Sequence, residues 1–453
     1  MLPLPRAFAE DRMNPYERLF APGFSAAPYW WDEAEPQPRE TPLPEHAAVA
    51  IVGGGYAGLS AALTLAHRGH RPVVLEAERI GYGASSRNGG MVSGGLKVAS
   101  GDLERRFGAA QAEAIAKAAA ASFRFLEELL RREGIACDYI RCGRFTPAWT
   151  RNHHTRMALR APKLAELTGM PVRMVAREDQ REVLGSDHYH GGMLVSAAGS
   201  LHPGKYARGL AEAAERAGAA LVDGTRVGGI RAEGTGFRLA TDKGEMAADA
   251  VLVTTNGYTR GEDGSSPMPW LMRRLVPVGS YIIATEELPE ETIDDLFPGR
   301  RMVSDSKRVL NYFRPSPDGR RVLWGGHASF GPTTPEAAAP VLHATMIKVF
   351  PELKAVRLTH AWTGNVAFTF DFLPHIGQQE GIYYAVGCQG SGVAMASWLG
   401  HNAALKIAGA ANEPFALDGL NVPTLPGYDG HPWFLPLVGG WYRLRDRMER
   451  PKG

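Results

Sequence analysis

Three consecutive glycines, Gly53 to Gly55, stand where an apolar run of strand type gives way to an alanine-rich helical pattern. A run of glycines is costly in backbone entropy, so its position suggests that something approaches the bare backbone closely. The hexapeptide Gly53–Gly58 fits the pattern G-x-G-x-x-G, whose glycines make a tight turn, admit a pyrophosphate and let helix and strand pack closely. A phosphate there would lie at a helix N-terminus, which favours anions. The alternative is a tight turn without a ligand.

Further polar groups follow soon after these glycines. Glu76 ends the next strand-like run, Pro72–Leu75, about 20 residues on, where dinucleotide-binding folds place the carboxylate that binds ribose hydroxyls. The glycine-flanked segment Gly81–Met91 offers hydroxyl, amide and backbone groups for phosphate or ring atoms, although it could also be an ordinary loop. The combination predicts a bound dinucleotide. Only one such fingerprint is present, since Gly234–Gly236 is better explained as a hairpin turn, and this disfavours enzymes that hold two dinucleotides on separate folds.

Other kinds of site are not indicated. The chain has no G-x-S-x-G nucleophile motif. It has three cysteines, an odd number, and they lack the spacing of zinc ligands: Cys137, Cys142 and Cys388. A disulfide framework is therefore not expected, which favours a reducing, cytoplasmic location. The pair His153-His154 lies in a polar stretch and is expected at the surface rather than at a metal ion. A net charge of +2 without a basic stripe gives no indication of nucleic-acid binding.

The elements that must position these residues follow from hydrophobic periodicity. Strand, glycine turn, helix and strand over residues 49–76 form a βαβ unit, and a long amphipathic helix with breaks is predicted over 102–133. Later strands at 219–222, 250–254 and 381–387 fit a return to this first layer, and an apolar helix over 393–408 follows the last of them. Two excursions interrupt it: alternating segments over 141–196, and strands at 277–285 and 321–325. Both predict antiparallel strands in a different layer.

The bulk composition is that of an ordinary globular protein. With 453 residues, 44% hydrophobic and 22% charged, the chain can bury the cores of two closely connected domains. No signal peptide is expected, and the glycines divide the uncharged stretch 47–66, so no transmembrane segment is expected either. We predict an α/β fold in which a doubly wound, Rossmann-like domain interleaves with a mixed or antiparallel-sheet substrate domain. The predicted segments are an irregular N-terminal arm (1–46), the first domain in three pieces (47–138, 198–268 and 355–453, the last with a C-terminal tail) and the second domain in two (139–197 and 269–354).

Three stretches resemble the signatures of a known family. The segment Gly83–Gly90, after Glu76, is similar to the second signature of the D-amino-acid-oxidase-type FAD-dependent oxidoreductases, and Asp371–Gly377 and Gly387–Gly392 are similar to the last two. The resemblance covers nearly the whole chain, and within the family it is greatest to the γ-glutamylputrescine oxidase branch, which shares the Tyr29–Trp31 arm. It implies that FAD is the dinucleotide. The positions that match FAD contacts are Gly53, Gly55, Tyr56, Ala57, Gly58, Glu76, Ala77, Ser85, Ser86, Asn88, Gly89, Gly90, Met91, Val227, Thr255, Asn256, Gly257, Gly364, Gly390, Ser391, Gly392 and Val393.

The resemblance also implies a role for the final helix. Gly390-Ser391-Gly392 opens that helix, so its N-terminus can point at the pyrimidine end of the flavin and stabilise the negative charge of the reduced ring. A simple N-cap formed by Ser391 is a compatible explanation of the same residues. Asp371 is expected to brace its loop rather than to transfer a proton.

Flavin amine oxidation asks little of side chains. The carbon next to a neutral amine gives a hydride to flavin N5, the imine hydrolyses, and oxygen takes the electrons as hydrogen peroxide, while the protein supplies position, desolvation and charge. We therefore expect oxidation of the C–N bond of a small amine or amino acid, with a γ-glutamyl-amine or polyamine-like substrate favoured. The candidates are Tyr281, His327 and Trp362 as catalytic residues, and Tyr312 and Arg314 as substrate-binding residues. Tyr281, Trp362 and Tyr312 are expected to line one aromatic surface that desolvates the amine. Ordinary packing is the alternative for each, and for Arg314 an ion pair in the turn before Asp318.

Two departures from the sarcosine-oxidase relatives affect these expectations. Those relatives tether the flavin through a cysteine just before the segment matching 371–377, whereas 362–370 contains none, so the FAD is expected to be non-covalent. They also use a lysine on a substrate-domain strand to activate oxygen, whereas the strand that matches reads Val322-Leu323-Trp324. The branch still favours an oxidase. The alternatives are a D-amino-acid or opine-type dehydrogenase that passes electrons to another acceptor, and a flavin-binding protein without turnover.

Overall fold

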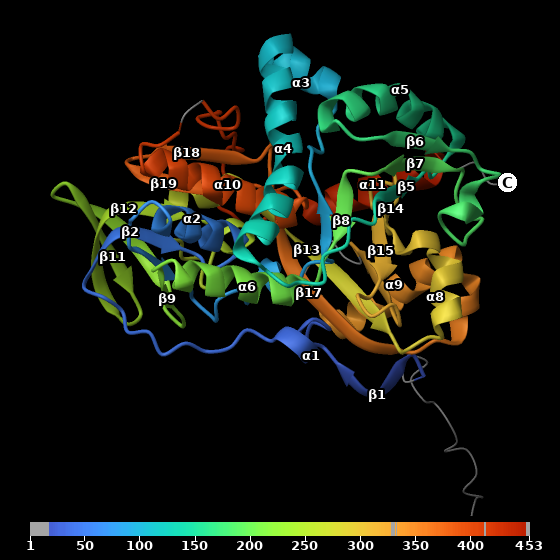
Figure 1. The fold of residues 1–453 in the computed structure, drawn as a ribbon, viewed down its shortest axis with the longest axis horizontal. Coiled ribbons are helices and arrows are strands. Elements are labelled where there is room, and N and C mark those ends of the chain that lie inside the picture. The colour runs from blue at the N-terminus through green and yellow to red at the C-terminus, as the bar shows by residue number, and fades with distance from the viewer. Residues whose placement is uncertain (1–17, 328–330, 332, 412–413, 450–453) are drawn as a thin grey trace, which may run out of the picture.

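The structure is a computed structural model that describes residues 18–327, 331, 333–411 and 414–449. Two sheets organise the chain, one of eight strands and one of nine (Figure 1). A short two-stranded sheet, β4 (Met91–Ser93) with β8 (Ala198–Ser200), accompanies them. The predicted α/β fold, with a doubly wound sheet interleaved with a second, mixed sheet, is confirmed.

The eight-stranded sheet has the parallel strands β3, β2, β12 and β19 at its centre. The last four residues of β2 are fully enclosed, as expected for a parallel strand covered on both faces. Four helices, α2 (Tyr56–Ala66), α4 (Ala109–Glu133), α6 (Pro203–Arg216) and α10 (Gly392–Ile407), contribute to one core against this sheet. The strands are β2 (His46–Val52), β3 (Pro72–Leu75), β9 (Ala220–Val222), β10 (Val227–Glu233), β11 (Gly236–Thr241), β12 (Gly244–Val253), β18 (His375–Gln379) and β19 (Ile382–Val386).

The nine-stranded sheet runs in the order β1-β17-β13-β16-β15-β14-β5-β7-β6. Its two longest strands, β13 and β17, form an antiparallel pair, and α9 (Pro335–Val349) packs on one face with α8 (Glu290–Leu296) nearby. Figure 1 shows these helices on the side of the sheet that faces away from the eight-stranded sheet. The strands are β1 (Phe20–Ser25), β5 (Arg144–Pro147), β6 (Val172–Val175), β7 (Gly192–Val195), β13 (Leu275–Thr285), β14 (Met302–Ser304), β15 (Asn311–Pro315), β16 (Val322–Gly326) and β17 (Leu358–Thr369).

Two local predictions are wrong. The stretch 141–196, expected to form only strands, contains the 18-residue helix α5 (Arg151–Thr168) between β5 and β6. Thr150 starts it by accepting a hydrogen bond from the His153 N–H, but most of its residues are not buried, so it lacks the broad apolar stripe that marks a helix in a sequence. The N-terminal arm is also more regular than expected, because β1 joins the nine-stranded sheet beside β17.

The predicted hairpin at Gly234–Gly236 is confirmed, since β10 and β11 pair on either side of it. The long helix predicted over 102–133 consists of α3 (Ser100–Phe107) and α4, separated at Gly108, where φ is +76°. Within the described residues, no helix is both long and apolar enough to cross a membrane. The division of the chain into domain segments stays a prediction, and β17, which follows the expected boundary at residue 354, belongs to the nine-stranded sheet.

Candidate active site

The glycine turn between β2 and α2 leaves no room for side chains. Gly53 has a φ of +110°, and a Cβ on Gly58 would lie 2.0 Å from the Gly53 carbonyl oxygen. Gly55 is the N-cap of α2 and provides no side chain to cap the helix. The Gly54 N–H donates to Glu76 at 2.7 Å, so the carboxylate lies directly beside the turn. Burial raises the pKa of Glu76, and the hydrogen bonds from two backbone N–H groups oppose that effect.

The segment 84–91 lies against the same turn. Ser85 Oγ accepts a hydrogen bond from the N–H of Tyr56, the first residue of α2, at 2.9 Å. Asn88 holds the segment in shape: its side-chain amide donates to the carbonyls of Ala84 and Ser85, and its oxygen accepts from Gly90 N–H at 2.8 Å. The segment therefore presents its backbone to the turn in a fixed conformation.

Two later segments close the ring around the turn. Thr254, after β12, donates to the Gly53 carbonyl at 3.0 Å. The side-chain oxygen of Asn256, in the short 3-10 helix η3 (Asn256–Tyr258), accepts from the Gly387 N–H at 2.9 Å and so fixes the start of the last glycine turn. Ser391 occupies the N-cap position of α10, but its hydroxyl accepts no hydrogen bond from the first turn, which corrects the expectation of a simple N-cap. The first N–H groups of α10 are thus available to an anionic group.

These segments fit a dinucleotide. Bare glycines at a helix N-terminus, a buried carboxylate beside them and two further glycine-flanked turns come together from distant parts of the chain. The expected contacts at Gly364 and Val227 lie close by: a Cβ on Gly364 would be 3.2 Å from Arg87, and the N–H of Thr225, two residues before Val227, donates to the Glu76 carbonyl at 2.7 Å. The roles of the individual contact residues stay predictions.

Three tryptophans position the segment 86–88: Trp362, a catalytic candidate from the sequence, and Trp30 and Trp31, which the sequence analysis did not assign to the site. Trp31 Nε1 donates to Ser86 Oγ at 3.0 Å, Trp362 Nε1 to the Arg87 carbonyl at 2.8 Å, and Trp30 Nε1 to the Asn88 carbonyl at 2.8 Å. Trp30 and Trp362 are completely buried and pack edge to face, with ring centroids 6.4 Å apart. Trp362 is therefore a positioning residue, which holds the segment 86–88 through its hydrogen bond to the Arg87 carbonyl.

The other aromatic candidates lie on opposite faces of the nine-stranded sheet. Tyr312 packs over Gly325 and lies 3.1 Å from where a Cβ on Gly89 would be, and its hydroxyl bonds to Ser280 at 2.8 Å. Tyr281 packs instead in the helix-covered core and donates to the Thr333 carbonyl at 3.3 Å. This corrects the expectation that both line one aromatic surface, because neighbouring side chains of a strand point to opposite faces.

Arg314 is buried against backbone carbonyls. Its Nη1 donates to the carbonyls of Gly90 and Leu201 at 3.0 and 2.8 Å, and its Nε donates to that of Pro315 at 3.0 Å. The expected ion pair in the turn before Asp318 is absent from the described structure. Instead, the guanidinium connects the end of the segment 84–91 to β15 and to the start of α6.

A basic cluster, which we define as Lys97, Arg144 and His327, lies where the chain leaves this segment. β4 begins at Met91, and Ser93, its last residue, accepts a hydrogen bond from Arg144 Nη1 at 3.2 Å. Lys97 retains accessible surface, but the protein packed around its ammonium and the charge of Arg144 lower its pKa to about 8. His327 follows β16 directly and contacts the Gly279 carbonyl at 3.2 Å. Burial lowers its pKa, and the charge of Lys97 lowers it further.

Two features make this cluster chemically unusual. Arg144 Nε is buried with no hydrogen-bond partner, and burial lowers the Arg144 pKa. Within the described part of the chain, no carboxylate pairs with Lys97 or Arg144. An unpaired and partly desolvated pair of cations is costly, so the arrangement suits an anionic ligand. No motif marks these residues in the sequence, because they come from three separate segments.

Two further expectations can be compared with the structure. His153 is buried, not at the surface: its ring contacts Ser306 at 2.6 Å and Glu449 at 3.2 Å. Among the residues described, no group of histidine, cysteine and carboxylate side chains could hold a metal ion. Asp371 braces its loop as expected, accepting hydrogen bonds from Thr369 at 2.6 Å and from the Leu373 N–H at 3.1 Å.

Solved structures share this fold over most of their length. Glycine oxidase from Geobacillus kaustophilus matches with a TM-score of 0.66 and 22% identity, over 83% of this chain and 99% of that one. L-proline dehydrogenase from P. horikoshii matches with a TM-score of 0.66 and 23% identity, over 82% and 96%.

Proteins found by sequence comparison have a higher identity to this chain than these solved structures do. The chain is 31% identical to a probable oxidoreductase OrdL of Rhizobium meliloti (strain 1021), over 96% of this chain and all of that protein. It is also 31% identical to the gamma-glutamylputrescine oxidoreductase of Escherichia coli (strain K12), over 88% of this chain and 93% of that protein. Residues 48–405 match the family model "DAO: FAD dependent oxidoreductase". The chain therefore belongs to the DAO family of FAD-dependent oxidoreductases, and FAD is its cofactor.

Proposed function

We propose that the protein oxidises the C–N bond of a small amine that carries a carboxylate, with a γ-glutamyl amine as the favoured substrate. Its relatives include proteins named gamma-glutamylputrescine oxidoreductase and glycine oxidase, which supports an amine or amino acid as the substrate class. Bound FAD supplies the oxidant, which takes a hydride from the carbon next to the amine nitrogen. The chain's own residues bind, orient and desolvate the substrate.

The basic cluster is the observation that carries this proposal. Lys97 and Arg144 place two positive charges beside the strand that continues from the FAD-binding segment, and neither has a carboxylate partner in the described structure. A substrate carboxylate would offset the charges of both. Polyamines have no such group. The cluster thus favours a γ-glutamyl amine or an amino acid over a free polyamine.

The opposite side of the substrate would face Tyr312 and the segment 84–91. The Tyr312 ring lies against Gly89, and burial raises the pKa of its hydroxyl to about 12, so it stays neutral at physiological pH. An aromatic surface that excludes water lowers the pKa of a bound amine. The amine then reaches the neutral form that hydride loss requires at a pH below its solution pKa.

Anaerobic bleaching of the flavin tests the proposal. A γ-glutamyl amine should bleach the oxidised protein, whereas the analogue without the α-carboxylate should need a concentration at least about tenfold higher, since hydrogen bonds to charged groups contribute about 1.5–3 kcal/mol. Replacing Lys97 or Arg144 by Met should remove that difference. Lys163→Met, which removes an exposed lysine paired with Glu166, is the control and should preserve it. Bleaching by no amine at all would support a flavin-binding protein without turnover.

The electron acceptor has two candidates. Oxygen is favoured by the resemblance to an oxidase branch, but Leu323, which we expect to match the oxygen-activating lysine of the sarcosine-oxidase relatives, is buried in an apolar cluster with Trp30 and Trp362. This position provides no charge to activate oxygen and favours the second candidate, a dehydrogenase with another acceptor. Stopped-flow mixing of substrate-reduced protein with oxygen distinguishes them. Reoxidation as fast as turnover indicates an oxidase, and reoxidation far slower than with an artificial dye indicates a dehydrogenase.

A further inference from the structure

The C-terminal helix α11 (Leu435–Glu449) presents its apolar side chains to solvent. Leu437, Trp441, Leu444 and Met448 are spaced four, three and four residues apart, so they form one stripe along a helix of 3.6 residues per turn. Their exposed fractions lie between 47% and 73%, and Trp433, just before the helix, is 64% exposed. We call these five residues the apolar stripe. A surface helix normally buries such a stripe against its own protein, and this one does the opposite.

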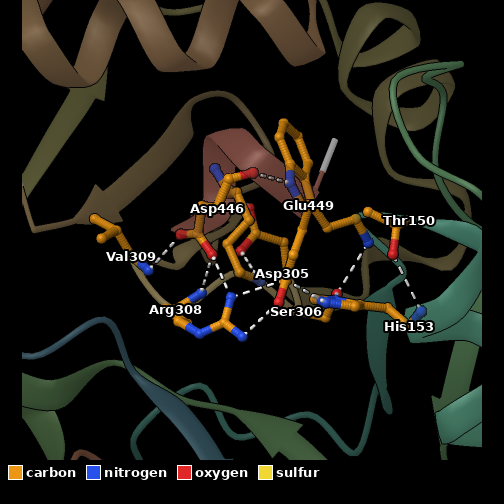
Figure 2. A network of polar contacts seen from close by, with 10 residues as sticks. Thr150, His153, Asp305, Ser306, Arg308, Val309, Asp446 and Glu449 are labelled. Carbon is orange, nitrogen blue, oxygen red and sulfur yellow. Dashed lines mark hydrogen bonds and ion pairs between the residues drawn. The ribbon is translucent and has the colours of Figure 1, made fainter. Parts of the chain in front are cut away.

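Ion pairs hold the inner face of α11 and fix this orientation. Figure 2 shows Arg308 reaching Asp446 and Glu449 from the segment after β14, with His153 of α5 on the other side of Glu449. Asp446 also accepts hydrogen bonds from the N–H groups of Arg308 and Val309 at 3.1 and 3.0 Å. Hydrogen bonds from Arg308 and His153 help to lower the pKa of Glu449 to about 2. The polar face of the helix is thus bound to the protein, which leaves the apolar stripe facing outward.

Arginines flank the apolar stripe on both sides. At 100° per residue, Arg445 lies on one flank and Arg447 on the other, and neither pairs with a carboxylate in the described part of the chain. The acidic residues of the helix, Asp446 and Glu449, point inward and are neutralised by Arg308. An apolar stripe with aromatic residues and flanking arginines is the pattern of a helix that lies in the plane of a membrane surface.

We propose that α11 docks the protein on an anionic lipid surface, with the apolar stripe in the acyl boundary and Arg445 and Arg447 at the headgroups. The charges decide between this surface and a second copy of the chain. A symmetric pairing of two α11 helices would bring the same flanks together and place arginine against arginine. Anionic headgroups instead complement both flanks, and each arginine near such a surface contributes about 1 kcal/mol. The docking is peripheral, as α11 is too short and too charged to span a bilayer.

Flotation of the full-length, FAD-loaded protein with vesicles tests the proposal. The protein should float with vesicles of phosphatidylcholine and phosphatidylglycerol in equal amounts, and much less with phosphatidylcholine alone or in high salt. Leu437→Gln combined with Trp441→Gln should lower the partition coefficient at least about tenfold, since each substitution removes apolar area that would be buried. Arg445→Gln combined with Arg447→Gln should lower it roughly 5- to 30-fold on anionic vesicles only.

Leu159→Gln provides the matched control. Leu159 is 78% exposed on α5, outside the apolar stripe, and its replacement should leave binding unchanged. Unchanged flavin absorbance and melting temperature show that each variant is folded. Failure of the parent protein to bind anionic vesicles, or equal binding by the Leu437/Trp441 variant, overturns the proposal. So does a parent dimer that this variant converts to monomers without any vesicle binding, since the stripe would then contact a second copy.

Discussion

The charge of Arg144 makes Lys97 harder to charge, and burial makes Arg144 itself harder to charge. The pKa of Lys97, about 8, lies well below that of a free lysine because of the protein packed around its ammonium and the neighbouring guanidinium, although the residue keeps accessible surface. An anion between them would offset both charges, as the proposed substrate carboxylate would. A pKa in this range also makes the proposed binding step dependent on pH near neutrality.

The first prediction concerns this pH dependence. Lys97 carries its charge below pH 8 and loses it above, so kcat/KM for a carboxylate-bearing amine should fall as pH rises through about 8. At lower pH it should fall as well, because the substrate amine is protonated and cannot release a hydride. Lys97→Arg keeps its charge throughout the alkaline range, so the alkaline fall should disappear. If kcat/KM fell in the same way above pH 8 for an amine that lacks the carboxylate, Lys97 would not be the group that binds the carboxylate.

The second prediction concerns Gly55. A Cβ there would already lie 3.0 Å from Ser85 Oγ, and the branched side chain of Gly55→Val would occupy the space that a pyrophosphate needs at the start of α2. The purified variant should be colourless, as measured by the ratio of flavin to protein absorbance. Gly229→Val is the control, because a Cβ on Gly229 meets nothing within 4 Å and a β-branched residue suits its strand. Normal FAD content in Gly55→Val would remove the glycine turn from the site.

At the scale of elements, the N-terminal arm serves the cofactor site rather than the sheet edge alone. Three indole N–H groups donate to three successive residues, Ser86, Arg87 and Asn88, of the proposed FAD-binding segment. Two of them come from the start of the short helix α1 (Trp31–Ala34), where Trp30 precedes the helix and Trp31 is its first residue, and the third is Trp362 of β17. These donors come from opposite ends of the chain and converge on one loop. The conformation of that loop therefore depends on two elements that do not belong to the doubly wound sheet.

The third prediction follows from these donors. Trp30→Phe keeps a ring in the buried cluster but leaves the Asn88 carbonyl without its donor, at an expected cost of about 1–3 kcal/mol in the free energy of unfolding. Because the affected loop is the proposed FAD-binding segment, FAD should also dissociate faster, which dilution followed by flavin fluorescence would measure. Trp398→Phe removes a comparable bond to the Ala118 carbonyl at 2.9 Å, remote from that loop. It should lower stability without changing the FAD dissociation rate. Equal rates in both variants would contradict a positioning role for Trp30.

Elements differ in how far the sequence predicts them. The glycine turns and the βαβ unit carry local patterns, so their positions follow from a few neighbouring residues. The helix α5 was missed because it is largely unburied and lacks a strong apolar stripe. In α11 the spacing of Leu437, Trp441, Leu444 and Met448 shows which residues share a face, but periodicity does not show whether that face points inward or outward. That depends on Arg308, more than a hundred residues away in the chain.

The same limit applies to the substrate side of the site. Tyr312 and Tyr281 were predicted to share a surface, and only the pairing of β13, β15 and β16 shows that their side chains point to opposite faces. Of the basic cluster, only His327 was a candidate from the sequence; Lys97 and Arg144 were not predicted. Its members depend on tertiary packing, and no fixed spacing identifies them in the sequence.

At the scale of the whole molecule, the fourth prediction is that FAD is held without a covalent bond. The described cysteines include Cys388, in the last glycine turn, but its thiol accepts a hydrogen bond from Asn256 at 3.4 Å, and burial raises its pKa. A buried neutral thiol is a poor nucleophile. Acid precipitation should release the yellow chromophore into the supernatant, where chromatography should identify it as intact FAD. Colour that stays with the precipitate would show a covalent link.

The strand order of the eight-stranded sheet has a consequence for how the protein is made. β12 lies between β2 and β19, and the hydrogen bond from Thr254 to Gly53 joins residues 201 positions apart. On the ribosome, β2 emerges early but cannot complete its pairing until β12 has been synthesised, and the sheet is finished only when β19 follows. β2 can pair with β3 early, but its other edge stays open while about 200 further residues are made, and an open apolar strand edge of this kind favours misassembly. The last glycine turn of the proposed FAD site begins at Gly387, so the site is complete only after this turn has emerged. We therefore expect FAD to bind in the last stage of translation or to the released chain.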